Sequence, residues 1–444
     1  MTDPTPSPAE LARIAVQGVL ADLRHTRHRG LVVDSPPGAG KTTLVVQAVR
    51  ALVAAKQPCI VIAQTNHQVN DLVRRLAAQA PDLQIGRLTA HTYTVPHHVL
   101  AMANTHSEVN IGALDKADVV IATARKWASV RDRQWPWAII DEAYQMRSDA
   151  LLLIAELAHR TLFVGDPGQL DPFSTIDTPR WLGLPHDPMN SAVAVLLQKN
   201  PDLPVHSLPV SWRLPPSAAD IVSKAFYPFT GFSAGTHKPD RRMEFATAGM
   251  RGPLDETVDL AALTGWALLE LPARHTARID PEASQAAADV ATRLLTRHAT
   301  TFCENEPDGR ALEPADIAIG TAHRDQARHI QQILHRQSPN LTGITVDTAN
   351  RLQGREYAVT IVVHPLSGRR DASAFHLEAG RLCVLTSRHR HACIVIARAG
   401  IADLLDAHPS TDPVHLGVPA KFPDGWEANH HVLAHLSDHR IRGT

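Results

Sequence analysis

The segment Ser35–Thr42, SPPGAGKT, decides how the first part of this 444-residue chain folds. It lies between an apolar run, Leu31–Val33, and a run of helical period that begins at Thr43. A strand, a glycine-rich loop and a helix in this order form a phosphate-binding loop. The match to the pattern GxxxxGK[ST] lacks only the first glycine, where this chain has Ser35. The segment therefore predicts an α/β domain that binds a nucleoside triphosphate.

Individual residues of this loop have separate roles in such a site. Gly38 and Gly40 allow consecutive backbone N–H groups to turn toward an anion at a helix N-terminus. We expect Lys41 to reach the β- and γ-phosphates and the Thr42 hydroxyl to ligate Mg²⁺. The predicted nucleotide-binding residues of the loop are Gly38, Ala39, Gly40, Lys41, Thr42 and Thr43.

The composition is that of a globular protein without a global attraction to polyanions. Hydrophobic residues make up 44% of the chain, charged residues 20%, and the formal net charge is −1. Because no overall basic field exists, a nucleic-acid site must be a local groove. The length leaves room for two to three domains.

Three further features indicate a cytoplasmic protein with no membrane partner. The four cysteines form no CxxC pair, which favours reduced, buried thiols. No apolar run reaches the ~18 residues of a membrane span. The N-terminus, MTDPTPSPAE, is polar and has no hydrophobic signal core.

Short apolar runs alternate with helical stretches in both halves of the chain, a pattern typical of parallel sheets covered by helices. In the first half the predicted strands are 30–34, 59–63, 119–122, 137–141 and 161–165. In the second half they are 265–271, 315–321, 344–348, 358–363 and 382–386.

A proline-rich patch at 201–216 marks the junction between the halves. We predict an N-terminal lead-in and helix over 1–29 and a first domain over 30–203, with a small insertion at about 88–117. A second domain follows over 204–400, with an irregular excursion at about 228–262. The predicted tail, 401–444, has one amphipathic helix from Trp426 to about His439.

Two polar turns follow apolar strands of the first half. The stretch 138–145, AIIDEAYQ, ends a strand in two carboxylates. Asp141 can hold Mg²⁺ through its water shell, and Glu142 can orient and deprotonate an attacking water. The stretch 161–170, TLFVGDPGQL, repeats this arrangement, and its Gln169 can hydrogen-bond the γ-phosphate or the attacking water.

These segments resemble the first-domain motifs of superfamily 1 helicases, in the Upf-like branch with its DEAxQ box and GDPxQL turn. The stretch 65–72, TNHQVNDL, resembles the family segment S-N-x-A-V-D-x-L. The stretch 118–124, DVVIATA, resembles the next segment that contacts nucleic acid. The resemblance places Thr65, Asn66 and Thr123 beside a nucleic-acid backbone.

The second half carries the remaining motifs of that family in the family's order. The stretch 210–216, VSWRLPP, resembles Q-Y-R-M-H-P, and this implies that Trp212 stacks on the adenine and Arg213 contacts the γ-phosphate. The stretch 346–356, VDTANRLQGRE, resembles V-x-T-V-D-S-F-Q-G-R-E. There the resemblance implies that Glu356 binds ribose and that Thr348 lies near the nucleic-acid backbone.

The stretch 381–390, RLCVLTSRHR, resembles R-L-N-V-A-L-T-R-A-R and puts Arg388 in the place of the arginine finger. The resemblance covers about residues 30–400. It implies an α/β fold of two RecA-like P-loop domains, each a parallel sheet flanked by helices, with the ATP site in the interdomain cleft. It also implies that ATP and Mg²⁺ are the cofactors and that single-stranded DNA or RNA, held through its backbone, is the partner.

The sequence thus predicts an ATP-dependent helicase or translocase, with 5′→3′ movement implied by the branch. Ala12 occupies the place of an upstream family glutamine and Gln17 is out of register, so the selectivity for adenine stays open. Two alternatives also stay open. One is an ATPase that remodels nucleoprotein complexes without unwinding duplex, which the short insertions favour. The other is a nucleotide-gated nucleic-acid-binding scaffold with little hydrolysis, against which Glu142 and Arg388 argue.

Overall fold

The computed structural model describes residues 6–170, 190–237, 240–409 and 424–443, and these form two compact units. The first unit comprises Met1–Ser35, Ala39–Pro167 and Asp171–Pro209. The second comprises Pro36–Gly38, Gly168–Leu170 and Val210–Thr444. The main division therefore falls between Pro209 and Val210 rather than at 203–204. Two short loops that precede it in the sequence also belong to the second unit.

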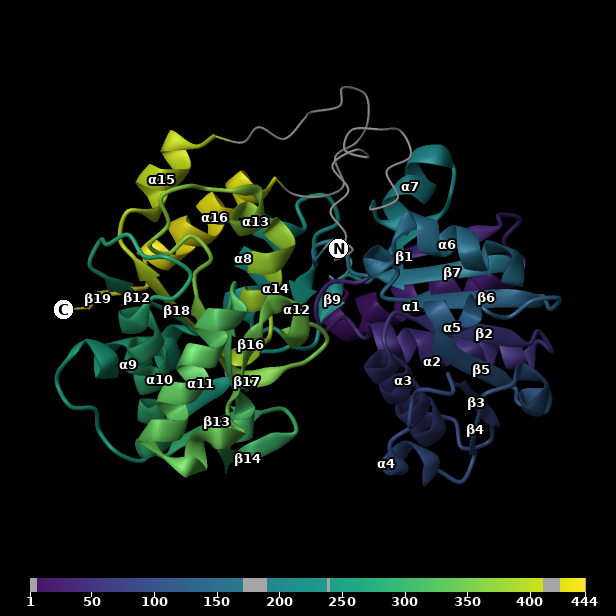
Figure 1. Cartoon of the computed structure of the whole chain (residues 1–444), viewed down its shortest axis with the longest axis horizontal. Coiled ribbons are helices and arrows are strands. Elements are labelled where there is room, and N and C mark those ends of the chain that lie inside the picture. The colour runs from purple at the N-terminus through teal and green to yellow at the C-terminus, as the bar shows by residue number, and fades with distance from the viewer. Residues whose placement is uncertain (1–5, 171–189, 238–239, 410–423, 444) are drawn as a thin grey trace, which may run out of the picture. The chain divides into compact units, whose positions relative to one another are not determined.

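An eight-stranded sheet forms the first unit, with the strand order β4-β3-β5-β2-β6-β7-β1-β8 (Figure 1). All of its pairings are parallel. The five strands predicted for the first half are confirmed, whereas β3, β4 and β8 were not predicted. The strands are β1 (Gly30–Asp34), β2 (Cys59–Ala63), β3 (Ile85–Leu88), β4 (Thr105–Glu108), β5 (Val119–Thr123), β6 (Trp135–Asp141), β7 (Ala158–Gly165) and β8 (Val205–Ser207).

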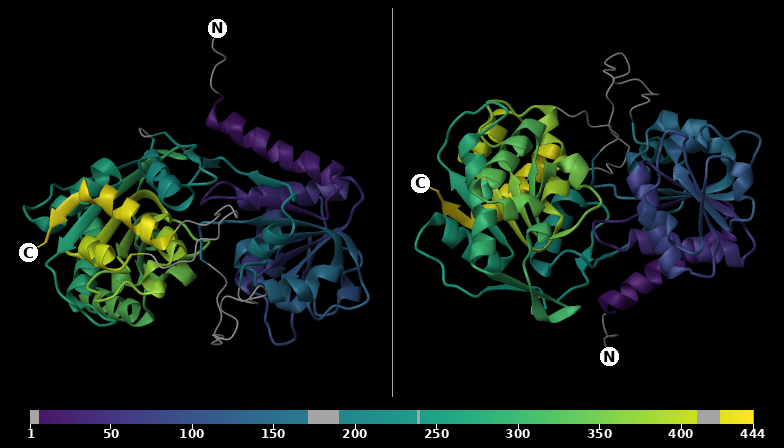
Figure 2. Two further views of the ribbon diagram at one scale, coloured as in Figure 1. Left: turned by 90° about the horizontal axis from the view of Figure 1, so that it is seen from above. Right: turned by 60° about the horizontal axis from the view of Figure 1, so that its bottom comes forward.

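Helices cover this sheet because alternate strand residues are apolar on the face that they bury. Val33, Val61 and Ile121 lie in one core cluster with side chains of α1, α2 and α3. The helix α1 can be followed along the first unit in Figure 2. The helices of this unit are α1 (Pro8–His25), α2 (Lys41–Ala54), α3 (Asn66–Gln79), α4 (His97–Leu100), α5 (Ala124–Trp127), α6 (Ser148–Ile154) and α7 (Ala192–Lys199).

A six-stranded parallel sheet organises the second unit, in the order β16-β15-β17-β18-β12-β19. Neighbouring residues of one strand enter different cores: Ile319 packs on one face of the sheet and Ala318 on the other. The α/β class predicted from the sequence is therefore confirmed in both units. The strands are β12 (Trp266–Leu271), β15 (Ile317–Thr321), β16 (Thr345–Thr348), β17 (Tyr357–Val363), β18 (His389–Arg398) and β19 (Arg440–Arg442).

Helices lie on both faces of this second sheet, and two small sheets accompany it. One small sheet pairs β9 (Val210–Ser211) with β10 (Ser233–Ala234), and the other is antiparallel and contains β11 (Arg242–Phe245), β13 (Ala299–Cys303) and β14 (Glu306–Ala311). Across the described parts of both units, no helix is long and apolar enough to cross a bilayer. The helices are α8 (Pro216–Phe226), α9 (Pro253–Thr264), α10 (Pro281–Thr296), α11 (Arg324–Gln337), α12 (Ala349–Leu352), α13 (Ala374–Leu377), α14 (Ala379–Thr386), α15 (Ile401–Ala407) and α16 (Gly425–Ser437).

Two sequence predictions for the second half are wrong. The stretch 382–386 belongs to helix α14, and the strand that it was taken for is β18, which begins at His389. Every residue of α14 from Gly380 to Thr386 is buried, so the run is apolar all round and has no helical period. The excursion at 228–262 is not irregular throughout, because it contains β10, β11 and most of α9.

The predicted tail helix is present as α16, and β19 follows it and pairs with β12. The tail also contains a second helix, α15, so the prediction of a single helix there is wrong. The intervening residues 410–423 of the predicted tail lie outside the described residues.

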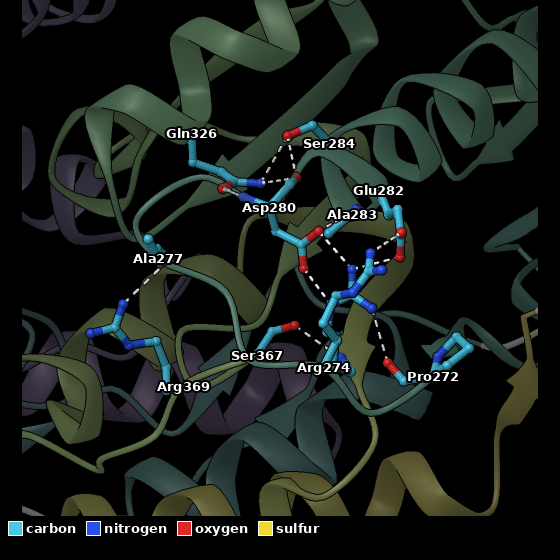
Figure 3. A network of polar contacts seen from close by, with 11 residues as sticks. Pro272, Arg274, Ala277, Asp280, Glu282, Ala283, Ser284, Gln326, Ser367 and Arg369 are labelled. Atoms are coloured by element: carbon cyan, nitrogen blue, oxygen red, sulfur yellow. Dashed lines mark hydrogen bonds and ion pairs between the residues drawn. The ribbon is translucent and has the colours of Figure 1, made fainter.

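A buried ion-pair network holds the loop between β12 and α10 at the carboxyl edge of the second sheet. Arg398, at the end of β18, donates from Nε and Nη2 to the two carboxylate oxygens of Asp280, at 2.6 and 2.9 Å. Asp280 also caps α10 through Ala283 N, and Gln326 bonds its backbone N–H and carbonyl, as Figure 3 shows. The network therefore connects β18, α10 and α11.

Replacing Arg398 with alanine is expected to destabilise the protein by roughly 3–5 kcal/mol, because the buried Asp280 carboxylate would lose its charged partner. Both side chains are almost fully buried, at 2% and 5% exposure. Urea unfolding of the variant and the wild type measures the difference. Arg328→Ala is the control, since its pair with Asp325 on α11 is exposed and should contribute at most about 1 kcal/mol. Equal losses in the two variants would contradict the assigned role of Asp280.

Candidate nucleotide site and nucleic-acid contacts

The phosphate-binding loop of the first unit ends at Gly40, which caps the N-terminus of α2 with φ of +87°. Lys41 is the first residue of α2, and its Nζ lies 2.5 Å from Glu142 Oε1. The two side chains are only 16% and 9% exposed. The structure thus pairs the predicted phosphate-binding lysine with the predicted general base.

Glu142 follows β6 in a left-handed backbone conformation, with φ of +53° and ψ of +44°. A non-glycine residue adopts this conformation only when its surroundings enforce it, and such positions concentrate at functional sites. Its second carboxylate oxygen, Oε2, accepts a hydrogen bond from Gln145 Nε2 at 2.9 Å. Lys41 and Gln145 therefore fix the carboxylate from two sides.

Several carboxylates surround the Lys41 ammonium. Burial lowers its pKa, but Glu142, Asp141 and Asp166 raise it more, so the net shift is upward. Burial raises the pKa of Asp141 to about 6, with a further rise from Glu142 and an opposing effect of Lys41. The surroundings of Lys41 are therefore rich in negative charge, which a divalent cation would offset.

Asp141 is suited to a metal ion. Its Oδ1 is buried and accepts no hydrogen bond from any residue that the structure describes. Carboxylate and hydroxyl oxygens are the donors that Mg²⁺ prefers. Asp141 at the end of β6 and Thr42 in the first turn of α2 fit a magnesium ion by this chemistry.

Tyr144 links three strand ends beside this site, and the sequence did not reveal it. Its hydroxyl donates to Asp34 Oδ1, at the end of β1, over 2.5 Å. Burial and the Asp34 carboxylate raise the pKa of Tyr144, so the phenol keeps its proton. A Cβ at Gly165, where β7 ends, would lie 2.8 Å from the Tyr144 ring. Because Gly165 has no side chain, the Tyr144 ring can pack against the end of β7.

Ser35, the departure from the consensus glycine, is buried beside this group. Its backbone N–H donates to Gly165 O at 2.8 Å. Its Oγ is buried and has no hydrogen-bond partner among the described residues. The loop thus tolerates a hydroxyl where the consensus has hydrogen only.

Gly38 lies in the part of the loop that belongs to the second unit, and it is held against the segment that follows β9. Trp212 N donates to Gly38 O at 2.9 Å, and Ser211 Oγ donates to Pro37 O at 2.6 Å. Gly38 has φ of +72°, and a Cβ there would lie 2.3 Å from Arg213 Cβ. Only glycine fits this position.

Replacing Gly38 with alanine is expected to lower stability more than the same change at Gly40. Both glycines have a left-handed backbone, which costs roughly 1–2 kcal/mol for alanine. A Cβ at Gly40 meets nothing within 4 Å, whereas one at Gly38 clashes with Arg213 and should add about 1–3 kcal/mol. The thermal midpoints of the two nucleotide-free variants measure this difference. Equal midpoints would show that the close approach to Arg213 is unimportant.

The second unit gathers Arg213, Glu356 and Arg388. Arg213 Nε donates to Glu356 Oε2 at 3.1 Å, and its Nη1 donates to Ser387 O at 3.5 Å. Arg388 is buried, with Nε directed to Val384 O at 3.2 Å and Nη2 to Ser387 Oγ at 3.1 Å. The predicted finger follows the C-terminal end of α14 and lies against that helix, beside the residue that Arg213 contacts.

Gln169 belongs to the second unit, although the sequence assigned it to the first domain. Its Oε1 accepts a hydrogen bond from Gln353 Nε2 at 2.8 Å. Gly380 is the second residue of α14, and a Cβ there would lie 2.6 Å from Gln169 O. Gln353 stands in the stretch that the sequence singled out for Glu356, yet its pairing with Gln169 depends on tertiary contacts and was not predicted.

Trp212 presents an exposed ring, at 41% of its surface, as a stacking residue requires. A Cβ at Gly235, just after β10, would lie 2.6 Å from the indole. The ring therefore approaches that glycine where a side chain would clash, and part of the tryptophan stays exposed.

The predicted nucleic-acid residues of the first unit lie at the ends of paired strands. Thr65 caps α3 after β2 and Thr123 caps α5 after β5, while Asn66 opens α3. Both threonine hydroxyls accept from a backbone N–H of their helix, at 3.3 Å. Thr65 is exposed, and Asn66 and Thr123 are half-buried. In the second unit Thr348 ends β16 at the N-cap position of α12, without a capping hydrogen bond from its side chain, and is buried.

These features define a class of protein. The first unit has the phosphate site of a P-loop nucleotide-binding domain. This site consists of the SPPGAGKT loop, a lysine paired with a strand-end glutamate and an aspartate oxygen without a hydrogen-bond partner among the described residues. The second unit adds a parallel sheet with two arginines and a glutamate gathered near α14. The chain is therefore a P-loop protein with two α/β units, each built on a parallel sheet.

Comparison with known proteins narrows this class to a family. A family model described as an AAA domain matches residues 21–175, and a second of the same description matches residues 189–400. The chain is 24% identical over 473 residues to DNA-binding protein SMUBP-2 of Mus musculus. It is 23% identical over 370 residues to DNA replication ATP-dependent helicase/nuclease DNA2 of Gallus gallus. These matches support a superfamily 1 helicase of the Upf-like branch.

The chain spans less than half the length of these curated relatives. The alignments cover 91% of this chain and 44% of SMUBP-2, and 81% of this chain and 34% of DNA2. Among solved structures, Arterivirus nonstructural protein 10 (helicase) matches 86% of this chain and 61% of that chain at 14% identity, with a TM-score of 0.45. Its complex with DNA matches 88% of this chain and 64% of that chain at 14% identity, with a TM-score of 0.44.

Proposed function

We propose that this chain is an ATP-dependent helicase or translocase that moves along single-stranded DNA or RNA. The observation that carries the proposal is the Lys41–Glu142 pair, because it unites the phosphate-binding lysine and the base of one hydrolytic site. The relatives add support, since their names describe a DNA-binding protein and an ATP-dependent helicase/nuclease.

In this proposal the first unit supplies the chemistry at the γ-phosphate. Lys41 leaves Glu142 when the phosphates of ATP arrive, and the carboxylate of Glu142 is then released to orient a water and take its proton. Gln145 keeps that carboxylate in place through its bond to Oε2. Thr42 and Asp141 would hold Mg²⁺, which offsets phosphate charge when it is bound.

The second unit supplies positive charge to the same nucleotide. Arg213 and Arg388 stabilise the negative charge of the transferring phosphoryl group, and Glu356 contacts the ribose. Arg388 must first leave Val384 O and Ser387 Oγ, and Arg213 must exchange Glu356 for phosphate. Because hydrolysis needs both units, each ATP cycle is coupled to a rearrangement of one unit against the other.

The nucleic-acid strand is held through its backbone by residues of both units. Thr65, Asn66 and Thr123 serve the first unit and Thr348 the second, and their hydroxyl and amide groups carry no base code. Alternating grip by the two units converts each hydrolysis into a step. The similarity to the Upf-like branch supports 5′→3′ movement.

The direct test is the ATPase rate with matched DNA and RNA oligonucleotides, single- and double-stranded, over a series of salt concentrations. We expect stimulation by single strands, with the stimulation falling as salt rises. The double-stranded oligonucleotides of the same sequence serve as the matched control. If none of the four nucleic acids stimulates hydrolysis, the proposal is contradicted.

The small size of the insertions favours a second function, that of an ATPase that displaces protein from nucleic acid. Residues 89–117 contain only one short strand, α4 and a single 3₁₀ turn at Ile111–Leu114. An unwinding assay with and without a protein roadblock separates the two functions. Duplex unwinding at a rate that the roadblock leaves unchanged would exclude the displacement function.

A further inference from the structure

Arg87 is the largest charged side chain of the first unit that the fold buries completely, with 1% of its surface exposed. It lies on β3, on the same face of the sheet as Ile85, and reaches α3. A buried guanidinium is costly unless carboxylates offset its charge. No carboxylate of the residues that the structure describes forms an ion pair with it.

The partners of Arg87 are all neutral. Its Nε donates to Asn70 Oδ1 and its Nη2 to Asn66 Oδ1, each at 3.0 Å, and its Nη1 points to Leu88 O at 3.4 Å. The Tyr93 ring lies 4.9 Å from the guanidinium carbon. The nearest acid along α3, Asp71, is engaged at 2.8 Å by Arg74 and by Arg75 instead. The charge of Arg87 is therefore solvated by dipoles only.

These contacts determine which way the Asn66 amide faces. A guanidinium can only donate hydrogen bonds, so the amide atom beside it must be the oxygen. The same argument orients Asn70, whose Nδ2 donates to Tyr93 Oη at 2.9 Å. Asn66 is half-buried, and no described residue accepts a hydrogen bond from its Nδ2. Its N–H₂ group is therefore turned away from Arg87 and left as a donor.

We propose that Arg87 is a positioning residue for nucleic acid, which holds the Asn66 amide with Nδ2 ready to donate to a backbone phosphate and strengthens that bond with its unbalanced charge. The inference rests on the proposed function, because it presumes that Asn66 contacts a bound single strand. The guanidinium charge is separated from the phosphate by one amide group only. It therefore lies within one Debye length of the phosphate and is only weakly screened. A neutral residue at position 87 would leave the amide free to turn.

The variant Asn70→Asp tests the charge. It puts a carboxylate oxygen where Asn70 Oδ1 now meets Arg87 Nε, and it leaves the bond from Nη2 to Asn66 in place. We expect an unchanged or higher thermal midpoint, because the buried cation gains a charged partner. We also expect the Kd for a fluorescein-labelled oligo-dT strand to rise at least about threefold. The slope of log K against log salt should fall by up to about 0.7.

A purely structural role for Arg87 predicts that Asn70→Asp does not change the Kd. In that case the added carboxylate would stabilise the fold and leave the Kd as it is in the wild type, which would overturn the inference. The control is Arg74→Gln, which removes a positive charge from the exposed side of the same helix. It should change the Kd less than about twofold, as expected for an exposed, screened charge.

A double-mutant cycle tests whether Arg87 acts through Asn66. Arg87→Gln should weaken binding on its own, but added to Asn66→Ala it should change the Kd by less than about twofold. Independent, additive losses would overturn the inference. If the wild type binds no oligonucleotide, the proposed function fails and the inference with it. Wild-type binding with an unchanged Kd for Asn70→Asp overturns the inference alone.

Discussion

Replacing Arg388 with alanine is expected to reduce the rate of ATP hydrolysis by about 10³-fold or more, because an arginine finger contributes ~10³–10⁵ in rate. For Arg388, an effect of this size requires that the charge of its guanidinium reaches the transferring phosphoryl group. In the described structure the guanidinium lies against Val384 O and Ser387 Oγ, next to the contact of Arg213 with Ser387 O. The variant removes the charge and leaves Arg213 and Glu356 in place.

Steady-state ATPase assays at saturating single strand measure this effect, together with binding of a fluorescent ATP analogue. We expect the analogue to remain bound, because Lys41 and the loop are unchanged. Arg328→Ala, an exposed arginine of the same unit, is the control and should hydrolyse ATP at the wild-type rate. Turnover of Arg388→Ala within tenfold of the wild type would remove this residue as the finger.

Glu142→Gln is expected to lower the hydrolysis rate by about 10²–10⁴-fold, the usual contribution of a general base. The amide keeps the shape of the side chain and its neighbour Gln145, but it cannot take a proton from water. Lys41 also loses its ion pair at 2.5 Å and is released toward the phosphates. The Kd for ATP should therefore stay the same or fall.

Single-turnover hydrolysis and titration with the same fluorescent analogue separate these two effects. Glu156→Gln, an exposed glutamate of the same unit, serves as the control. Rapid hydrolysis by Glu142→Gln would assign the base to another group. Loss of ATP binding would show instead that the Lys41–Glu142 pair maintains the fold of the loop.

The sequence predicted the elements that short apolar runs and turn residues specify. Cys59–Ala63 is one such case: the predicted strand and the observed β2 share both bounds. The helix α9 was missed although Pro253 opens it, Asp255 and Glu256 lie in its first turn and Gly265 ends it. These start and stop signals were present, but the glycines, prolines and charges around them suggested a loop.

The misassigned stretch 382–386 shows a physical limit. A helix buried on all sides and a buried strand are both continuous apolar runs, so periodicity cannot distinguish them. In β18 two histidines and one arginine occupy buried positions, and His389 has neither ring nitrogen hydrogen-bonded within the described part of the chain. Burial, together with the charges of His391 and Arg213, lowers the pKa of His389 to about 3, which keeps the imidazole neutral.

The site was predictable where one local segment carries it and not where the fold brings distant residues together. Lys41 and Glu142 were each identified from their own motif, and each was given its own role. The contacts of Tyr144 with Asp34, of Gln353 with Gln169 and of Arg87 with Asn66 join residues 21 to 184 positions apart. Such pairs depend on strand order and register, which the sequence alone did not determine.

Streptavidin displacement tests whether hydrolysis by this chain drives movement along a single strand. Oligonucleotides with biotin at the 3′ or the 5′ end are each bound to streptavidin and incubated with the wild type or Glu142→Gln and ATP. We predict displacement from the 3′ end by the wild type, as 5′→3′ movement requires, and none by the variant. Strand-stimulated ATP hydrolysis without displacement from either end would contradict such movement.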